Sequence, residues 1–185
     1  MIKELLKEGE ERMQAVINAT KNAFAAVRTG RANPNILDRI TVDYYGTPTP
    51  LNQLANISVP EARLLVIQPW DKSSIKEIEK AILSSDLGLT PTNDGNVIRI
   101  AFPQLTEDRR KELVRVVRKD AEEYKVGVRN VRRDLNESIK ALEKEGEISE
   151  DESRRYLEQV QELTNEYVEK IDQLLEIKEK EILEI

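Results

Sequence analysis

The sequence predicts an α+β protein in which a three-helix bundle carries a small inserted α+β module. Three observations support this fold class. Apolar residues recur with a helical period near the N-terminus and again over the last eighty or so residues. All seven prolines lie between Pro34 and Pro103, among short β-rich runs. Charged residues make up 35% of the chain and aromatic residues 4%, a composition that favours long solvated helices over a thick globular core.

Residues 2–28 have the pattern of an amphipathic helix. Thr29-Gly30 ends the pattern and Asn33-Pro34 follows, as expected at a helix stop. Gly9 falls on the apolar face, where glycine costs roughly 1 kcal/mol relative to alanine. The other residues of this face are Ile2, Leu5, Leu6, Met13, Val16, Ile17, Thr20, Phe24 and Val27.

The middle of the chain predicts four strands and one short helix. The predicted strands are residues 40–45, 54–59, 64–67 and 97–102. Residues 73–84 have a helical pattern between the third and fourth strands. Residues 46–50 and 93–95 contain turn-forming residues. We expect the second strand to end before Pro60.

Two long helices follow the module. Residues 106–145 form the stronger prediction, with Thr106 as N-cap and acidic residues in the first turn. Ser149 is expected to cap the third helix, with Glu152 at the third position. The apolar stripe of the first of these helices is Leu113, Val117, Ala121, Tyr124, Val128, Val131, Leu135, Ile139 and Leu142. The stripe of the second is Tyr156, Val160, Leu163, Tyr167, Ile171, Leu174 and Ile182.

Amphipathic helices of this kind must pack together to be stable. The first is separated from the other two by the whole middle module, so we expect an insertion. The predicted domains are residues 1–30 with 105–185, and residues 31–104. Two short connections then join the domains and are expected to act as a hinge. The hinge residues are Thr29, Gly30, Arg31, Gln104 and Leu105.

Composition excludes several kinds of chemistry. The chain has no cysteine and no histidine, which removes disulfides, thiolate chemistry and the commonest general base. The N-terminal residues lack the apolar core of a secretory signal, and no run of about 18 apolar residues occurs. Paired carboxylates occur only among charged helix faces. We therefore expect a cytoplasmic protein that is not an enzyme, with no catalytic residue, no metal, no cofactor and no membrane contact.

A stripe of basic residues on the second helix is the main candidate site. Lys125, Arg129, Arg132 and Arg133 share one helix face in a chain whose net charge is −6. Residues 106–146 carry 12 basic and 10 acidic residues, whereas residues 147–185 carry 5 and 13. Arginine can grip a phosphate through two parallel hydrogen bonds, so the stripe favours a polyanion such as structured RNA. The full stripe is Lys111, Arg115, Arg118, Lys125, Arg129, Arg132, Arg133 and Lys140.

Four alternatives or lesser features remain open. The stripe is also typical of a solvated face that pairs with acids of the third helix. Val126 and Gly127 are expected to let the basic backbone approach a ligand closely. Residues 43–50 fit either a binding loop or a strand that ends in a proline-rich turn. Trp70-Asp71-Lys72 is typical of a helix entry, and Trp70 is expected in the core.

Several motifs, in order along essentially the whole chain, resemble those of bacterial ribosome recycling factors. They are residues 27–32 (VRTGRA), 43–51 (DYYGTPTPL), 79–82 (EKAI), 85–89 (SDLGL), 95–99 (GNVIR), 105–111 (LTEDRRK) and 128–134 (VRNVRRD). The resemblance implies an L-shaped protein with a β/α/β domain on a flexible hinge. It also implies rRNA contacts by bundle arginines, which correspond here to Arg28, Arg31, Arg129, Arg132 and Arg133.

The resemblance implies a mechanical role after termination. Such a protein binds the large ribosomal subunit and, with elongation factor G and GTP, splits the post-termination complex into subunits. Adding Lys125 from the basic stripe gives six expected rRNA-binding residues, and nothing in the sequence requires more than a monomer. The rival hypothesis is a helical adaptor that docks an acidic protein partner. An enzyme would need carboxylates of shifted pKa in a cleft.

Overall fold

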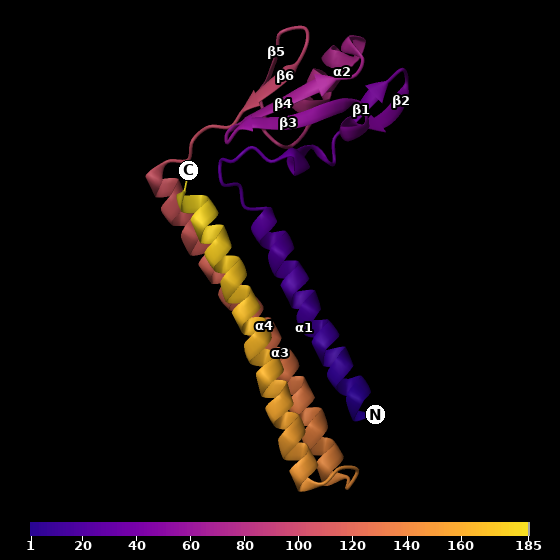
Figure 1. Cartoon of the computed structure of the whole chain (residues 1–185), viewed down its shortest axis with the longest axis vertical. Helices are drawn as coiled ribbons and strands as arrows, with labels where there is room; N and C mark the ends of the chain where they lie inside the picture. The colour runs from indigo at the N-terminus through magenta and orange to yellow at the C-terminus, as the bar shows by residue number, and fades with distance from the viewer. Residues whose placement is uncertain (185) are drawn as a thin grey trace. The chain divides into compact units, whose positions relative to one another are not determined.

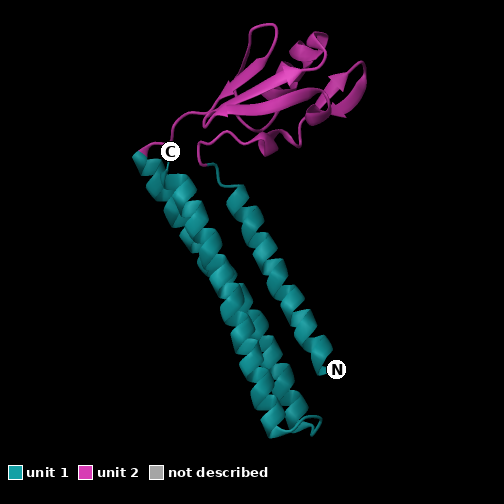
Figure 2. Ribbon diagram, viewed as in Figure 1, with its two compact units in different colours: residues 1–28, 107–184 teal, residues 29–106, 185 magenta. Residues whose placement is uncertain are grey.

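The computed structural model describes residues 1–184 and divides them into two compact units (Figure 2). Unit 1 consists of residues 1–28 and 107–184, and unit 2 of residues 29–106. The chain leaves unit 1 once and returns to it once, so unit 2 is an insertion. The α+β two-domain fold predicted from the sequence is confirmed.

Unit 1 is a bundle of three long helices (Figure 1). They are α1 (Ile2–Ala25), α3 (Glu107–Lys144) and α4 (Glu150–Leu183). Helix α1 ends three residues before the predicted boundary. The Ser149 side chain accepts a hydrogen bond of 3.1 Å from the Glu152 backbone N–H, so the predicted cap of α4 is confirmed.

The bundle core follows the predicted periodicity. Of the nine positions in the apolar stripe of α3, all but Tyr124 and Leu142 are buried. On α1, Gly9 is buried together with Met13, Ile17 and Phe24. A Cβ atom at Gly9 would lie 2.5 Å from Leu135 Cδ1. The glycine that weakens α1 as an isolated helix therefore allows α1 and α3 to approach closely.

Unit 2 contains a four-stranded antiparallel sheet in the order β3-β4-β6-β5 and a separate hairpin, β1-β2. The strands of the sheet are β3 (Ala55–Glu61), β4 (Leu64–Pro69), β5 (Pro91–Asn93) and β6 (Ile98–Ala101). The hairpin strands are β1 (Thr41–Tyr44) and β2 (Thr47–Pro50). The single α-helix is α2 (Ile75–Ser84), and three short 3₁₀ helices are η1 (Pro34–Leu37), η2 (Leu51–Gln53) and η3 (Lys72–Ser74).

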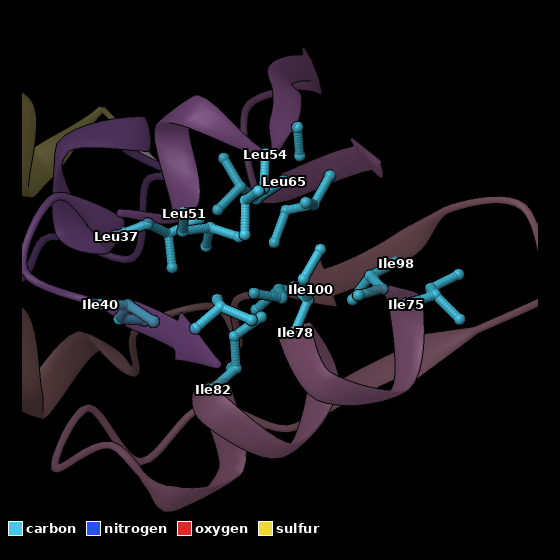
Figure 3. Close-up of a cluster of buried hydrophobic side chains, with 13 residues drawn as sticks. Leu37, Ile40, Leu51, Leu54, Leu65, Ile75, Ile78, Ile82, Ile98 and Ile100 are labelled. Carbon is cyan, nitrogen blue, oxygen red and sulfur yellow. The ribbon is translucent and has the colours of Figure 1, made fainter. Parts of the chain in front are cut away.

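One apolar cluster holds unit 2 together (Figure 3). Ile78 and Ile82 of α2 meet Ile98 and Ile100 of β6, and all four are fully buried. Leu37 of η1 and Leu51 of η2 close the other side of the cluster. The apolar cluster of unit 2 thus uses buried residues from every element of the insertion except β2, β5 and η3.

The sequence did not predict β2 or β5. The TPTP segment of β2 looked like a turn because of its prolines, but it pairs with β1, with Pro48 opposite Asp43. Tyr45 and Gly46 have φ of 48° and 82°, as a two-residue hairpin turn requires. Strand β3 continues past Pro60 to Glu61, because it lies at the sheet edge and bulges between Ser58 and Glu61.

Trp70 is the clearest error among the core predictions. Its side chain is 70% exposed, whereas a core position was expected. The predicted helix entry beside it is confirmed, because the Asp71 carboxylate accepts a hydrogen bond from the Ser73 backbone N–H at 3.0 Å. The Tyr44 and Tyr45 hydroxyl groups also donate to Asp71, at 3.1 and 3.3 Å.

Candidate nucleic-acid interface

Three arginines of α3 gather around one surface hollow. Arg129 and Arg133 are exposed, and Arg132 is partly buried. The hollow has a volume of about 350 Å³ and carries four cationic side chains against one carboxylate. We call it the basic hollow. It is lined by Arg129, Asn130, Arg132, Arg133, Asn136, Glu137 and Lys140.

Arg132 is held by an amide of α4. Its Nη1 donates a hydrogen bond of 3.3 Å to Gln161 Oε1. Gln161 Nε2 donates in turn to Asn165 Oδ1 at 2.9 Å. The guanidinium is therefore oriented by neutral groups and retains its full positive charge.

Asp134 is directed away from the basic hollow. This aspartate is the nearest acid to the three arginines in sequence. Its Oδ2 accepts a hydrogen bond of 2.9 Å from Arg12 Nη2 of α1. Within residues 1–184, neither Arg129 nor Arg133 takes part in an ion pair. The charge of these two arginines is available to an anionic partner.

Lys125 occupies a different environment from the three arginines. Its side chain is 12% exposed and forms ion pairs with Asp172 of α4 and, at 3.2 Å, with Glu122. The Asp172 carboxylate, and to a smaller extent Glu122, raises the pKa of the Lys125 ammonium. The rRNA-binding role of Lys125 stays a prediction, but its charge is already engaged within the bundle.

Arg118 is engaged in the same way. Its Nε donates to Glu179 Oε1 of α4 at 2.6 Å, and this hydrogen bond raises the pKa of the guanidinium. The basic stripe therefore has two parts. Arg118 and Lys125 pair with acids of α4, as the solvated-face alternative expects, whereas Arg129, Arg132 and Arg133 line the basic hollow.

The expectation for Gly127 was wrong. A Cβ atom at this position would lie 3.6 Å from Val16 Cγ2 of α1. The small residue therefore faces another helix of the bundle rather than a ligand. Its neighbour Val126 is 50% exposed.

Neither Arg28 nor Arg31 is among the residues that line the basic hollow. Val16 of α1 faces Gly127 of α3, two residues before Arg129, and α1 continues nine residues beyond Val16 to Ala25, about 13 Å. Arg28 follows that end of the helix in unit 1, and Arg31 belongs to unit 2. Both side chains are exposed.

The predicted hinge residues all lie in or beside the two connecting segments. Thr29 is buried, and Gly30 has a φ of 81°. A Cβ atom at Gly30 would lie 3.4 Å from the Pro103 carbonyl oxygen and from Leu105 Cγ. The two segments, residues 29–31 and 103–105, are therefore in contact with each other. Gln104 is exposed.

Sequence reasoning missed four residues that line the basic hollow or contact one of its arginines. Asn130, Asn136 and Glu137 line the basic hollow, but none belongs to the apolar stripe or to the basic stripe of α3. Gln161 comes from α4, and which α4 residue faces Arg132 depends on how the two helices pack. Asn130 lies in the VRNVRRD motif, which gives a signal that could have been used.

Over the described part of the chain, no three carboxylates come together in a way that would hold a metal ion. Nor does any helix formed by residues 1–184 have the length and apolar character needed to cross a membrane.

Comparisons with known proteins agree on one family. The family model described as ribosome recycling factor matches residues 20–183. A ribosome-recycling factor of Bacillus subtilis is 62% identical over 185 residues, covering all of both chains. One from Desulforamulus reducens is 58% identical, again over the full length of both.

Two solved structures share the fold. A solution structure of ribosome recycling factor superposes with a TM-score of 0.79 at 47% identity, over 100% of this chain and 98% of the other. The second has a TM-score of 0.65 at 48% identity, over 99% of both chains. It represents the T. thermophilus ribosome recycling factor and E. coli elongation factor G bound to the E. coli post-termination complex.

Proposed function

This chain belongs to the ribosome recycling factor family, and from that premise we propose that it binds the large ribosomal subunit through the basic hollow. With elongation factor G and GTP, it splits the post-termination complex so that the subunits can initiate again. It works as a cytoplasmic monomer, without a catalytic residue or cofactor of its own. Its contribution is mechanical, and GTP hydrolysis on elongation factor G supplies the energy.

The observation that carries this proposal is the set of three arginines at the basic hollow, none of which forms an ion pair within residues 1–184. Arg129 and Arg133 are exposed, and Arg132 is held by a neutral amide. A guanidinium in this state can donate charge-assisted hydrogen bonds to rRNA phosphates. Arg28 and Arg31 add cationic contacts near the first connection between the two units.

The relative bound with elongation factor G on a post-termination complex supports the choice of partners. Elongation factor G acts on unit 2 in this proposal. Residues 29–31 and 104–105 allow unit 2 to swing while unit 1 stays on the large subunit. The close contact of the two connecting segments at Gly30 confines that motion to a short stretch of chain.

Co-sedimentation with ribosomal subunits tests the binding step. We expect the protein to pellet with large subunits at low salt and to be released as salt rises, because phosphate contacts displace counterions. The double variant Arg129→Ala/Arg133→Ala should bind at least tenfold more weakly, on the order of 1.4 kcal/mol or more. Arg118→Ala is the matched control, because that arginine of the same helix is already paired with Glu179.

A splitting assay tests the activity. Post-termination complexes should separate only when the protein, elongation factor G and GTP are all present. Absence of pelleting with ribosomes would favour the adaptor hypothesis. Equal binding by the double variant and by Arg118→Ala would contradict the role given to the basic hollow.

A further inference from the structure

Three cations of α3, spaced seven residues apart, contact α4. Arg118 pairs with Glu179 at 2.6 Å, Lys125 pairs with Asp172, and Arg132 hydrogen-bonds to Gln161 at 3.3 Å. Seven residues make about two helical turns, so the three cations lie along one side of α3. Each of the three therefore lies at the same seam between α3 and α4.

The partners on α4 change character along this seam. From Glu179 to Asp172 the antiparallel helix also steps by seven residues. A further step of seven reaches Asn165, which accepts the hydrogen bond from Gln161. At the third step α4 presents a pair of amides where the first two steps present carboxylates. This occurs in a segment, residues 147–185, that contains 13 acidic residues.

An amide and a carboxylate affect an arginine differently. A carboxylate can bind a guanidinium through two parallel hydrogen bonds and cancel its charge. A single amide oxygen fixes the side chain with one of its five N–H donors and leaves the others available. Because Gln161 Nε2 is held by Asn165 Oδ1, the Gln161 oxygen is turned toward Arg132.

We propose that Gln161 is a positioning residue for rRNA binding, which presents Arg132 to a phosphate without neutralising it. This inference rests on the proposed function. It extends the binding site to α4, a helix that does not line the basic hollow. It also explains the two kinds of contact along one seam: the carboxylate pairs join α3 to α4, and the amide pair keeps Arg132 available.

The test compares substitutions at Gln161 with one at Arg132. Purified full-length variants Gln161→Glu, Gln161→Ala and Arg132→Ala are titrated against isolated large ribosomal subunits at four or more salt concentrations. The slope of log affinity against log salt counts the phosphate contacts. Thermal unfolding is measured alongside. Gln159→Glu is the matched control, because it adds the same charge to an exposed site two residues away, on a different face of α4.

Gln161→Glu should fold at least as stably as wild type and yet bind about tenfold more weakly, the loss expected for one charge-assisted hydrogen bond. Its salt slope should fall by roughly 0.7 to 0.9, the value for one phosphate contact, as for Arg132→Ala. Gln161→Ala should bind about threefold more weakly with an unchanged slope, because Arg132 loses order but keeps its charge. Gln159→Glu should bind like wild type.

The relative affinities of these variants for large ribosomal subunits test the positioning role of Gln161. If Gln161 only supported the helix packing, Gln161→Glu would bind at least as well as Gln161→Ala, and that result would overturn the inference. Equal weakening by Gln161→Glu and Gln159→Glu would assign the effect to general repulsion and would also overturn it. If Arg132→Ala bound like wild type, the proposed role of Arg132 would fail, and the positioning role with it.

Discussion

Arg12 of α1 donates a hydrogen bond of 2.9 Å to Asp134 of α3. Asp134 directly follows Arg133, the last arginine of the basic hollow, in the sequence. The pair of Arg12 and Asp134 is half exposed, with 53% and 46% of the two side chains accessible. Its direct effect on stability is therefore about 0 to 1 kcal/mol. Its effect on the hollow is electrostatic, because an unpaired Asp134 would lower the local positive potential.

Arg12→Ala should weaken binding to large ribosomal subunits about twofold at low salt. A unit charge acting over roughly 10 Å of water contributes about 0.4 kcal/mol. Adding Asp134→Ala in the same chain should restore most of the affinity, because the exposed carboxylate is then gone. Binding curves for the two single variants and the double variant measure this coupling. A double variant weaker than Arg12→Ala would contradict it.

Lys125→Met should affect stability more than ribosome binding. The substitution keeps the apolar stem but removes the ion pairs with Asp172 and Glu122. We expect a loss of about 1 kcal/mol in the free energy of unfolding, and an affinity for large subunits within about twofold of wild type. Urea unfolding and co-sedimentation check the two parts. A loss of binding as large as that of Arg132→Ala would place Lys125 in the interface.

Gly9→Ala should destabilise the bundle although alanine favours helices. The helix gains about 1 kcal/mol from the substitution, but the new Cβ at 2.5 Å from Leu135 Cδ1 forces a buried side chain to move, at about 1 to 3 kcal/mol. The net expectation is a loss of about 1 kcal/mol in urea unfolding followed by circular dichroism. Combining it with Leu135→Ala should cost less than the sum of the two single variants. A more stable Gly9→Ala protein would refute the close approach.

Gly30→Ala should slow subunit splitting while large-subunit binding is kept. A residue other than glycine at a φ of 81° costs roughly 1 to 2 kcal/mol, and its Cβ would lie in van der Waals contact with the Pro103 carbonyl oxygen, 3.4 Å away. Light scattering with elongation factor G and GTP measures splitting. Gly88→Ala is the control, because it has a φ of 66° in open surroundings within the same unit. If both variants split subunits equally fast, the connecting segment has no special role.

The stability of unit 2 should carry an acid-sensitive contribution from Asp94. Hydrogen bonds from the Val97 and Asn96 backbone N–H groups and from Arg99 hold the pKa of this carboxyl well below its usual 3.8. A depressed folded-state pKa stabilises the fold above pH 4 and loses that effect as pH falls toward the folded value. The difference in unfolding free energy between wild type and Asp94→Asn should be largest above about pH 5 and shrink below about pH 4. Urea unfolding monitored by Trp70 fluorescence measures it, and a pH-independent difference would count against it.

The sequence predicted the helices well because their signals are local and repeated. A stripe such as Leu113 to Ile139 is fixed by spacing along one helix, and the Ser149 cap depends on residues three apart. Strand β2 was missed because a proline-rich segment becomes a strand only through its pairing with β1. Trp70 was misplaced because exposure depends on which neighbours cover a side chain, and composition does not contain that information.

The sequence by itself determined the three helices, the insertion between them and the basic stripe, because periodicity, capping and charge are properties of residues near one another in the chain. Only the tertiary structure decided which cations remain available. The packing of α1 against α3 assigns Arg12 to Asp134, and the register of α4 gives Lys125 an acid but Arg132 an amide. Pairing of side chains across helices depends on the rotation and the register of each helix. A small change in either determines whether the charge of an arginine or lysine is cancelled by an acid or remains available to a partner.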